Sequence, residues 1–187
     1  MKKMTLMIVG ILMATMNVNA QNSELKNEIG LFYGFGSASN VVSIITGAFS
    51  GAVGDQSNFW GPVGVEYYRH VTPVVAVGGI VSIAGCKVKD KNNSASDFTE
   101  SFYTFMPGVK FNWLRKEHFG MYSGVAAGIM IASGDTKGNP NVKGESEVYF
   151  MGQGTALGVE FGGAFRGFAE LGFGEKGVLC AGIRYKF

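Results

Sequence analysis

Six charged residues of this sequence carry its strongest chemical signal, because an alternating strand pattern would turn all six away from its apolar side. They are three acids and three bases: Glu66, Glu160, Glu170, Lys110, Arg166 and Arg184. Ionised side chains that leave water have to be paired, so this set predicts a network of salt bridges. The network is either a structural filling of a narrow interior or a polar path for small solutes. The structural filling is favoured, because a small barrel is just wide enough inside for side chains.

The register of these charges can be predicted from the nearest turn. Counting back from Gly162–Gly163 places Glu160 and Arg166 opposite each other on adjacent strands, with Arg184 beside Arg166 on the strand that follows. We therefore expect Arg166 to be a structural charge whose removal leaves a carboxylate unpaired.

Two histidines are the candidates for acid–base or acyl-transfer chemistry. His70 and His118 lie beside short connections, at Val71 and Leu114, and so at the same end of the fold. Neither is placed within the roughly 3 Å that a serine–histidine pair needs. No metal-ligand spacing occurs, and the Gly-X-Gly pairs do not open a helix as a phosphate-binding loop would. The sequence therefore indicates no catalysis, no cofactor and no metal site.

The two cysteines, Cys86 and Cys180, fall on the inward side of strands that are not neighbours. A disulfide needs Cα atoms within about 7 Å, so two buried free thiols are favoured over a bond, although an oxidising compartment would allow one. Two cysteines in any case cannot form a disulfide scaffold.

The composition limits the elements that can position these residues. Of 187 residues, 47% are hydrophobic and only 16% are charged, which argues against a disordered chain. The sequence has no run of Lys and Arg, which argues against nucleic acid as a binding partner. Residues 1–20 have a positively charged start, an apolar stretch over 4–16 and a small residue at Ala20. This pattern is typical of a secretory signal peptide, and a buried N-terminal helix is the alternative interpretation. Cleavage there would leave a formally neutral domain over 21–187.

From Ile29 onward the repeating signal is an alternation with a period of two, which is typical of β-strands. In its first instance Ile29, Leu31 and Tyr33 are separated by Gly30 and Phe32. Eight such runs occur, with bulky outward residues that begin at Ile29, Val63, Val75, Tyr103, Phe119, Leu157, Phe165 and Leu179. No stretch of eighteen apolar residues follows residue 20, so no transmembrane helix is predicted.

The connections between these runs alternate between short and long. The short ones fall at 71–73, 114–118 and 162–163, the long ones at 38–57, 87–98 and 134–146, and the last link, 174–177, is short where a long one is expected. Antiparallel hairpins with their short turns at one end predict an eight-stranded, all-β, up-and-down barrel.

The bulky side of the strands decides what surrounds this barrel. A soluble barrel turns its large apolar side chains inward and its polar ones to water, as lipocalins do. Here the side opposite the bulky residues holds glycine, alanine and a few charges, which suits a crowded lumen. The bulky residues then face lipid, and an even number of antiparallel strands closes the sheet, as hydrocarbon requires. The sequence therefore predicts a transmembrane barrel, with a soluble periplasmic ligand-binding barrel as the weaker alternative.

The signal segment, the eight strands and the terminal GIRYKF together resemble the small outer-membrane β-barrels of Gram-negative bacteria, of the OmpA-transmembrane or OmpX kind. This resemblance implies an outer-membrane location, both termini and the short turns in the periplasm, and long loops outside. It also implies that Ile183, Tyr185 and Phe187 form a signal for the outer-membrane insertion machinery. The glycine-rich strands and the Asn- and Lys-bearing loops suggest the Bacteroidetes branch.

The resemblance also places both histidines at the periplasmic end. Barrel enzymes that modify lipid A work near the outer leaflet, so this placement argues against them. Two functions remain: a structural or surface-interaction component that meets envelope or host molecules through loops 38–57, 87–98 and 134–146, and a minor porin-like pore. Outer-membrane lipid is the expected surrounding in either case.

The segment 38–57 is unusual for an outer loop because it is apolar. Val41, Ile45 and Phe49 are among residues with a partly helical spacing, so a short interfacial helix is one interpretation and an extension of the flanking strands is the other. Either would expose an apolar patch to lipid or to a partner.

Overall fold

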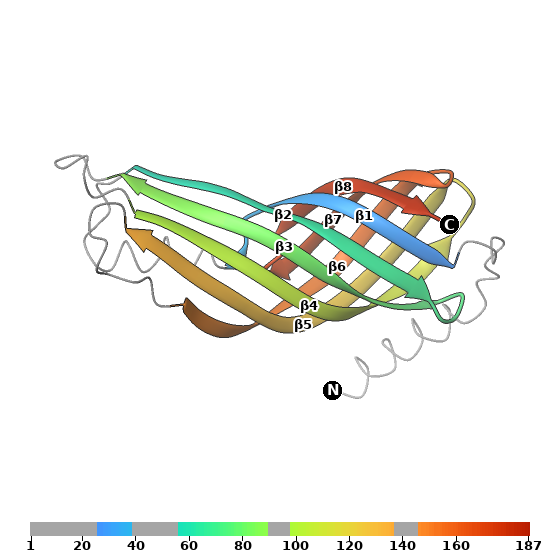
Figure 1. Ribbon diagram of the computed structural model, residues 1–187. Coiled ribbons are helices and arrows are strands. Elements are labelled where there is room, and N and C mark those ends of the chain that lie inside the picture. Colours follow the sequence, from blue (N-terminus) through green and yellow to red (C-terminus); the bar gives the residue numbers. More distant parts are fainter. Residues whose placement is uncertain (1–25, 39–55, 90–97, 137–145) are drawn as a thin grey trace, which may run out of the picture.

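The computed structural model describes residues 26–38, 56–89, 98–136 and 146–187, and these form a closed barrel of eight antiparallel strands in chain order (Figure 1). The strands are β1 (Asn27–Phe35), β2 (Gln56–His70), β3 (Val75–Lys89), β4 (Phe98–Arg115), β5 (Phe119–Thr136), β6 (Ser146–Gly162), β7 (Phe165–Gly174) and β8 (Leu179–Lys186). Eight alternating runs had been predicted, and each one forms a strand. The expected signal peptide over 1–20 lies outside the described residues.

Each strand pairs with the next one in sequence, and β8 pairs with β1 to close the sheet, as in the pair Ile29 and Tyr185. The short links after β2, β4 and β6 lie at the same end as the C-terminus (Figure 1). Phe187 and Asn27 exchange two backbone hydrogen bonds there, of 2.8 and 2.9 Å. The up-and-down topology and the grouping of short turns at one end are therefore confirmed.

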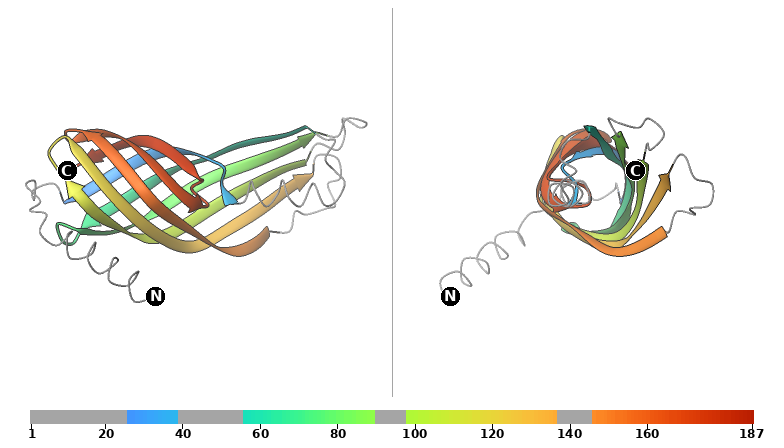
Figure 2. Two further views of the ribbon diagram at one scale, coloured as in Figure 1. Left: turned by 180° about the vertical axis from the view of Figure 1, so that it is seen from behind. Right: turned by 90° about the vertical axis from the view of Figure 1, so that its left-hand side faces the viewer.

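The strands differ in length, and this gives the barrel two unlike ends. β1, β7 and β8 have 9, 10 and 8 residues, whereas β2 to β6 have 15 to 18. The longer strands continue past the others at the end away from the C-terminus (Figure 2). We call this extension the protruding sheet; it comprises residues 56–60, 84–89, 98–102, 130–136 and 146–152.

The outward face of the barrel is apolar from one aromatic belt to the other. On β4, Tyr103 and Trp113 mark the two belts, and Phe105 and Phe111 between them are exposed. Ten residues separate the belts, or about 33 Å of strand, which at a tilt of about 40° spans roughly the 25 Å of a barrel's apolar band.

Further exposed large apolar side chains line every other strand, for example Leu31, Val65, Val81, Val125, Phe161, Leu171 and Ile183. Among the described residues, no helix is long and apolar enough to cross a membrane. The chain is an eight-stranded β-barrel of the outer-membrane type. The alternative of a soluble ligand-binding barrel is wrong, because that fold needs these side chains inside.

Glycine on the inward face makes room for large side chains on the neighbouring strand. A Cβ atom added at Gly158 would overlap the ring of Tyr122, and one added at Gly182 would lie 2.8 Å from the ring of Phe168. The lumen is thus filled by a few large residues that lie over glycines.

Candidate functional site

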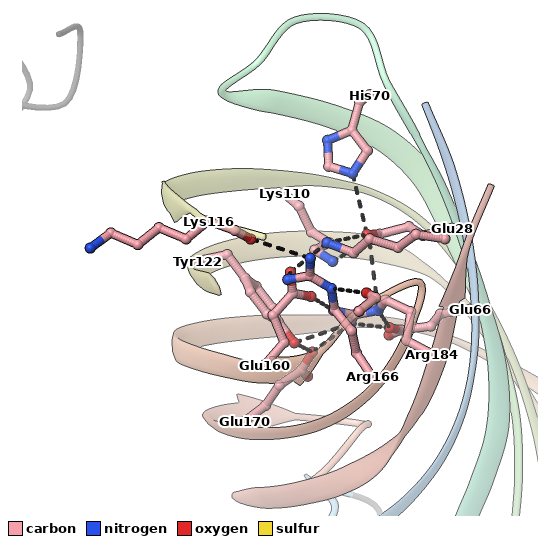
Figure 3. A network of polar contacts seen from close by, with 12 residues as sticks. Glu28, Glu66, His70, Lys110, Lys116, Tyr122, Glu160, Arg166, Glu170 and Arg184 are labelled. Carbon is pink, nitrogen blue, oxygen red and sulfur yellow. Dashed lines mark hydrogen bonds and ion pairs between the residues drawn. The ribbon is translucent and has the colours of Figure 1, made fainter. Parts of the chain in front are cut away.

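The six charged residues predicted from the sequence all point into the lumen, and all are at most 5% exposed. Glu66 comes from β2, Lys110 from β4, Glu160 from β6, Arg166 and Glu170 from β7, and Arg184 from β8. The structure brings them together in one network that also includes Glu28, Lys176 and Lys186 (Figure 3).

Arg184 lies at the centre of this network. Its guanidinium contacts Glu66, is 2.7 Å from Glu160 through Nη1, and receives further carboxylates at 3.7 Å from Glu28 and Glu170. Four carboxylates from four strands therefore converge on one buried cation. Arg184 is 1% exposed, so these charges interact with little solvent screening.

Lys176 enters the lumen from the end away from the C-terminus and is 2% exposed. It belongs to the turn between β7 and β8, and its Nζ donates hydrogen bonds of 2.6 Å to both Glu66 and Glu170. Its backbone N–H donates to Oε1 of Gln153 at 2.7 Å. The short last link therefore folds into the barrel and carries a buried cation there, instead of forming an outer loop.

Glu28 organises the inner, C-terminal end of the lumen. It contacts Lys110, lies 3.5 Å from Nζ of Lys186 and accepts a 3.2 Å hydrogen bond from Nε2 of His70. His70 is thus held by a carboxylate and belongs to the network; His118 is exposed in the turn before β5.

Arg166 closes the inner end by binding two turns at once. Its Nε donates to the carbonyl of Gly163 at 2.8 Å, and its Nη2 donates to the carbonyls of Lys116 and Glu117 at 3.2 and 2.6 Å. Nη1 reaches Glu160 at 3.1 Å.

The predicted register around Arg166 is partly wrong. Arg166 faces Gly162 across the ladder and Glu160 faces Phe168, so Glu160 and Arg166 are not direct cross-strand partners. The long arginine side chain reaches the carboxylate diagonally. Arg184 does lie directly opposite Arg166 on β8, as expected.

Aromatic rings enclose the charges between the strands. Tyr122 donates a 2.7 Å hydrogen bond to Glu170 and accepts one of 3.1 Å from Arg184. The guanidinium of Arg184 also lies 4.2 Å from the ring centroid of Phe168, and Nζ of Lys176 lies 4.7 Å from that of Phe32. These cation–π contacts add to the ion pairs in a desolvated interior.

Little space remains in the lumen beside this network. The cavity lined by Tyr68, Lys110, Tyr122, Glu170 and Lys176 has a volume of about 10 Å³. That is room for about one water molecule. No group of three or more His, Cys, Asp or Glu side chains in the described part of the chain could hold a metal ion.

The remaining predicted residues lie elsewhere. Ile183, Tyr185 and Phe187 share the outward, lipid-facing side of the last strand, and the Tyr185 and Phe187 rings stack at 5.8 Å. Cys180 has a free, buried thiol. The Cys86 side chain lies outside the described part.

Sequence reasoning missed Glu28, Lys186 and Lys176 as members of the network. Glu28 directly precedes Ile29, and Lys186 follows Arg184 by two, so strict alternation could have found both. Lys176 lies in a turn, where alternation does not apply, so no comparable signal marked it.

Comparisons with known proteins give only distant likenesses. No protein-family model and no curated protein matches the sequence. The crystal structure of Ail, the attachment invasion locus protein of Yersinia pestis, in complex with the heparin analogue sucrose octasulfate is 15% identical, with a TM-score of 0.48 over 87% of this chain and 100% of that one. The crystal structure of Ail alone is also 15% identical, with a TM-score of 0.44 over 87% of this chain and 97% of that one. Likenesses this distant say nothing about the function of this chain. The comparisons do not support the predicted assignment to the Bacteroidetes branch.

Proposed function

We propose that this protein is a non-catalytic component of the outer membrane, in which the barrel is an anchor and the protruding sheet with its loops meets other molecules. The observation that carries this proposal is the contrast between a filled lumen and an open sheet at the outer end. A minor pore is the alternative, and the tightly paired charges and small cavity of the lumen argue against it.

The protruding sheet offers an edge that the closed barrel lacks. The pairing of β6 with β7 begins only at Gln153 and Gly174, and the carbonyl of Gly152 accepts a 3.2 Å hydrogen bond from the N–H of Glu175. Within the described part of the chain, residues 146–151 therefore pair with β5 alone. Val148 and Phe150 on this edge are 64% and 80% exposed. A strand edge with apolar side chains can pair with an extended polypeptide, so we propose such a segment of a neighbouring or host molecule as partner.

Blocking the β6 edge tests this role. A fluorescent strand-forming peptide of alternating Thr and Val should bind the folded protein in vesicles, and Val148→Lys should weaken binding at least tenfold, because a charge on an edge strand opposes pairing. Ser101→Lys is the matched control, since Ser101 on β4 is paired on both sides. Equal binding by both variants would rule out the edge.

The outer-membrane location depends on the signal segment and the last strand. We propose that residues 1–20 are cleaved and that Ile183, Tyr185 and Phe187 are read by the insertion machinery; all three sit exposed on one face of the barrel's C-terminal end.

Deleting Phe187 should impair assembly while leaving export intact, because the terminal aromatic side chain is lost. Heat-modifiable migration and outer-membrane yield measure assembly, and intact mass measures cleavage. Normal yield of the truncated chain, or retention of residues 1–20, would contradict this assignment.

A further inference from the structure

The lipid-facing side of the barrel has a groove over β3, β4 and β5, three neighbouring strands on the near face in Figure 1. Its volume is about 460 Å³, against about 10 Å³ for the cavity in the lumen. The side chains along it include Val77, Pro107, Val109, Val125 and Ala127. These residues are apolar and do not belong to the ionic network, so the groove is a separate feature of the outer surface.

A row of small residues forms the floor of this groove. Pro107 on β4 lies opposite Gly79 on β3, and the register of β4 with β5 places Ala127 on its other side. The outward rows on both sides of the floor are bulkier, and each lies about 7 Å away along the strands. The row nearer the protruding sheet is Val81, Phe105 and Ile129, and the row nearer the C-terminal end is Val77, Val109 and Val125. The floor is therefore a trough wide enough for a single hydrocarbon chain.

The side chains of the groove cannot turn to fill it. Glycine, alanine and proline have no side-chain freedom, and valine is restricted about its one side-chain torsion. A Cβ added at Gly79 would meet its nearest atom, the backbone oxygen of Met106, at 3.4 Å, so the floor has room for a further group. The groove is thus preformed, and an occupant binds it at little cost in side-chain entropy.

Pro107 also interrupts the backbone ladder beneath the groove. In the described pairing of β4 with β5, the register is the same on both sides of this point, but the ladder omits Met106 and Pro107. Proline has no N–H to donate, and an unpaired carbonyl is costly in hydrocarbon, so proline is normally confined to edge strands. Here β4 is not an edge, because Pro107 pairs with β3 as well. Such departures concentrate at functional sites, so this one is a second indication that the floor has a role beyond closing the sheet.

The depth of the groove determines what can occupy it. Tyr103 and Trp113 mark the two aromatic belts on β4, and Pro107 lies four residues from Tyr103. Four residues are about 13 Å of strand, or about 10 Å along the membrane normal at a tilt of about 40°. The groove therefore opens into the hydrocarbon of the leaflet next to the protruding sheet, where acyl chains are the surrounding medium.

We propose that this groove is a binding site for one acyl chain of a membrane lipid in that leaflet. The chain lies on Pro107 and Ala127, between the walls formed by the two bulkier rows. A second copy of this protein fits less well, because a symmetric contact would bring two hollows together. The proposal depends on the barrel architecture and not on the proposed surface-interaction role.

Retention of lipid through detergent exchange tests this site. The folded, full-length mature protein is reconstituted with dipalmitoylphosphatidylcholine, extracted in a mild detergent and weighed by native mass spectrometry. Most of the unmodified protein should keep one lipid molecule. Ala127→Phe fills the groove and should reduce the lipid-bound fraction at least fivefold. Ala181→Phe makes the same change at an exposed position on β8 and should leave that fraction unchanged.

Gly79→Val provides a second way to fill the groove, because the space at Gly79 accepts a side chain in ordinary contact. It should also reduce the lipid-bound fraction at least fivefold, and heat-modifiable migration shows that each variant is folded. Loss of all lipid from the unmodified protein, or unchanged retention in the folded groove variants, would overturn the proposal. A dimer of the unmodified protein that both groove variants abolish would also overturn it, since a second copy would then occupy the groove.

A photoreactive lipid locates the retained chain. Phosphatidylcholine with a diazirine in the middle of one acyl chain replaces the first lipid, and the protein is illuminated after detergent exchange. Most adducts should fall within residues 77–81, 105–109 and 125–129. Adducts spread evenly over the lipid-facing strands would contradict the proposal, whatever the outcome of the edge-binding test.

Discussion

The lumen of the closed barrel and the inward face of the protruding sheet are built from the same long strands but filled with opposite chemistry. In the lumen of the closed barrel, carboxylates and cations from both walls meet around Arg184. On the inward face of the protruding sheet, Ala84, Phe102 and Met130 form an apolar cluster on one wall. Charged residues can fill a closed tube because each finds partners on the opposite strands, whereas an open sheet offers no such partners.

The comparison also separates two tasks. A network that joins side chains from β1, β2 and β4 to β8 across the lumen gives a rigid, filled anchor in lipid. A sheet with an exposed edge and polar loops can change its contacts without disturbing that anchor. Stability should therefore reside in the lumen and recognition in the protruding sheet.

The largest expected effect in this comparison is that of Arg184→Met. It leaves Glu66, Glu160, Glu28 and Glu170 short of their shared cation, and breaking a buried ion pair costs about 3–5 kcal/mol. Urea unfolding in lipid vesicles, followed by tryptophan fluorescence, measures the loss. The exposed Arg69 gives the matched control, and Arg69→Met should change stability by less than about 0.5 kcal/mol. Similar losses in both variants would show that the lumen charges are not the source of stability.

A smaller effect is expected for Arg166→Met. Glu160 keeps Arg184 and Lys186 as partners, so the loss should be about 2 kcal/mol, from the hydrogen bonds to Glu160 and to the turn carbonyls. Adding Glu160→Leu should not restore stability, because Arg184 and Lys186 then lose a carboxylate. Recovery in the double variant, measured by the same unfolding experiment, would mean that Glu160 and Arg166 form an isolated pair.

The smallest effect is expected in the protruding sheet. Val148→Ser changes a side chain that is 64% exposed beyond the closed barrel, so the free energy of unfolding should shift by less than about 0.5 kcal/mol. A loss as large as that of Arg166→Met would show that the protruding sheet is part of the anchor.

The barrel could be predicted from the sequence alone, because alternation with a period of two shows directly which side of each strand faces lipid. It also pointed the six lumen charges inward, but it could not reveal their connectivity. That depends on strand stagger and side-chain length: Arg166 reaches Glu160 although Gly162 is its ladder partner. Lys176 was beyond prediction, because alternation does not apply to a turn, and its hydrogen bonds to Glu66 and Glu170 depend on how that turn folds into the lumen.

Strand length was the other feature that alternation could not determine. The apolar pattern of β7 stops at Phe173, yet nothing in it shows that β6 continues beyond its partner as far as Ser146. The protruding sheet thus follows from the pairing of strands and not from any one of them.

The central claim, that the lumen is a filled anchor and not a pore, is tested most directly by conductance of the full-length mature protein in planar lipid bilayers. The unmodified protein should show no discrete current steps at voltages up to about 100 mV, because Lys176, Glu66 and Glu170 leave a cavity of about 10 Å³ in the lumen. Steps that appear in the unmodified protein and grow in Lys176→Met, but not in the control Lys116→Met, would contradict the account and establish the pore.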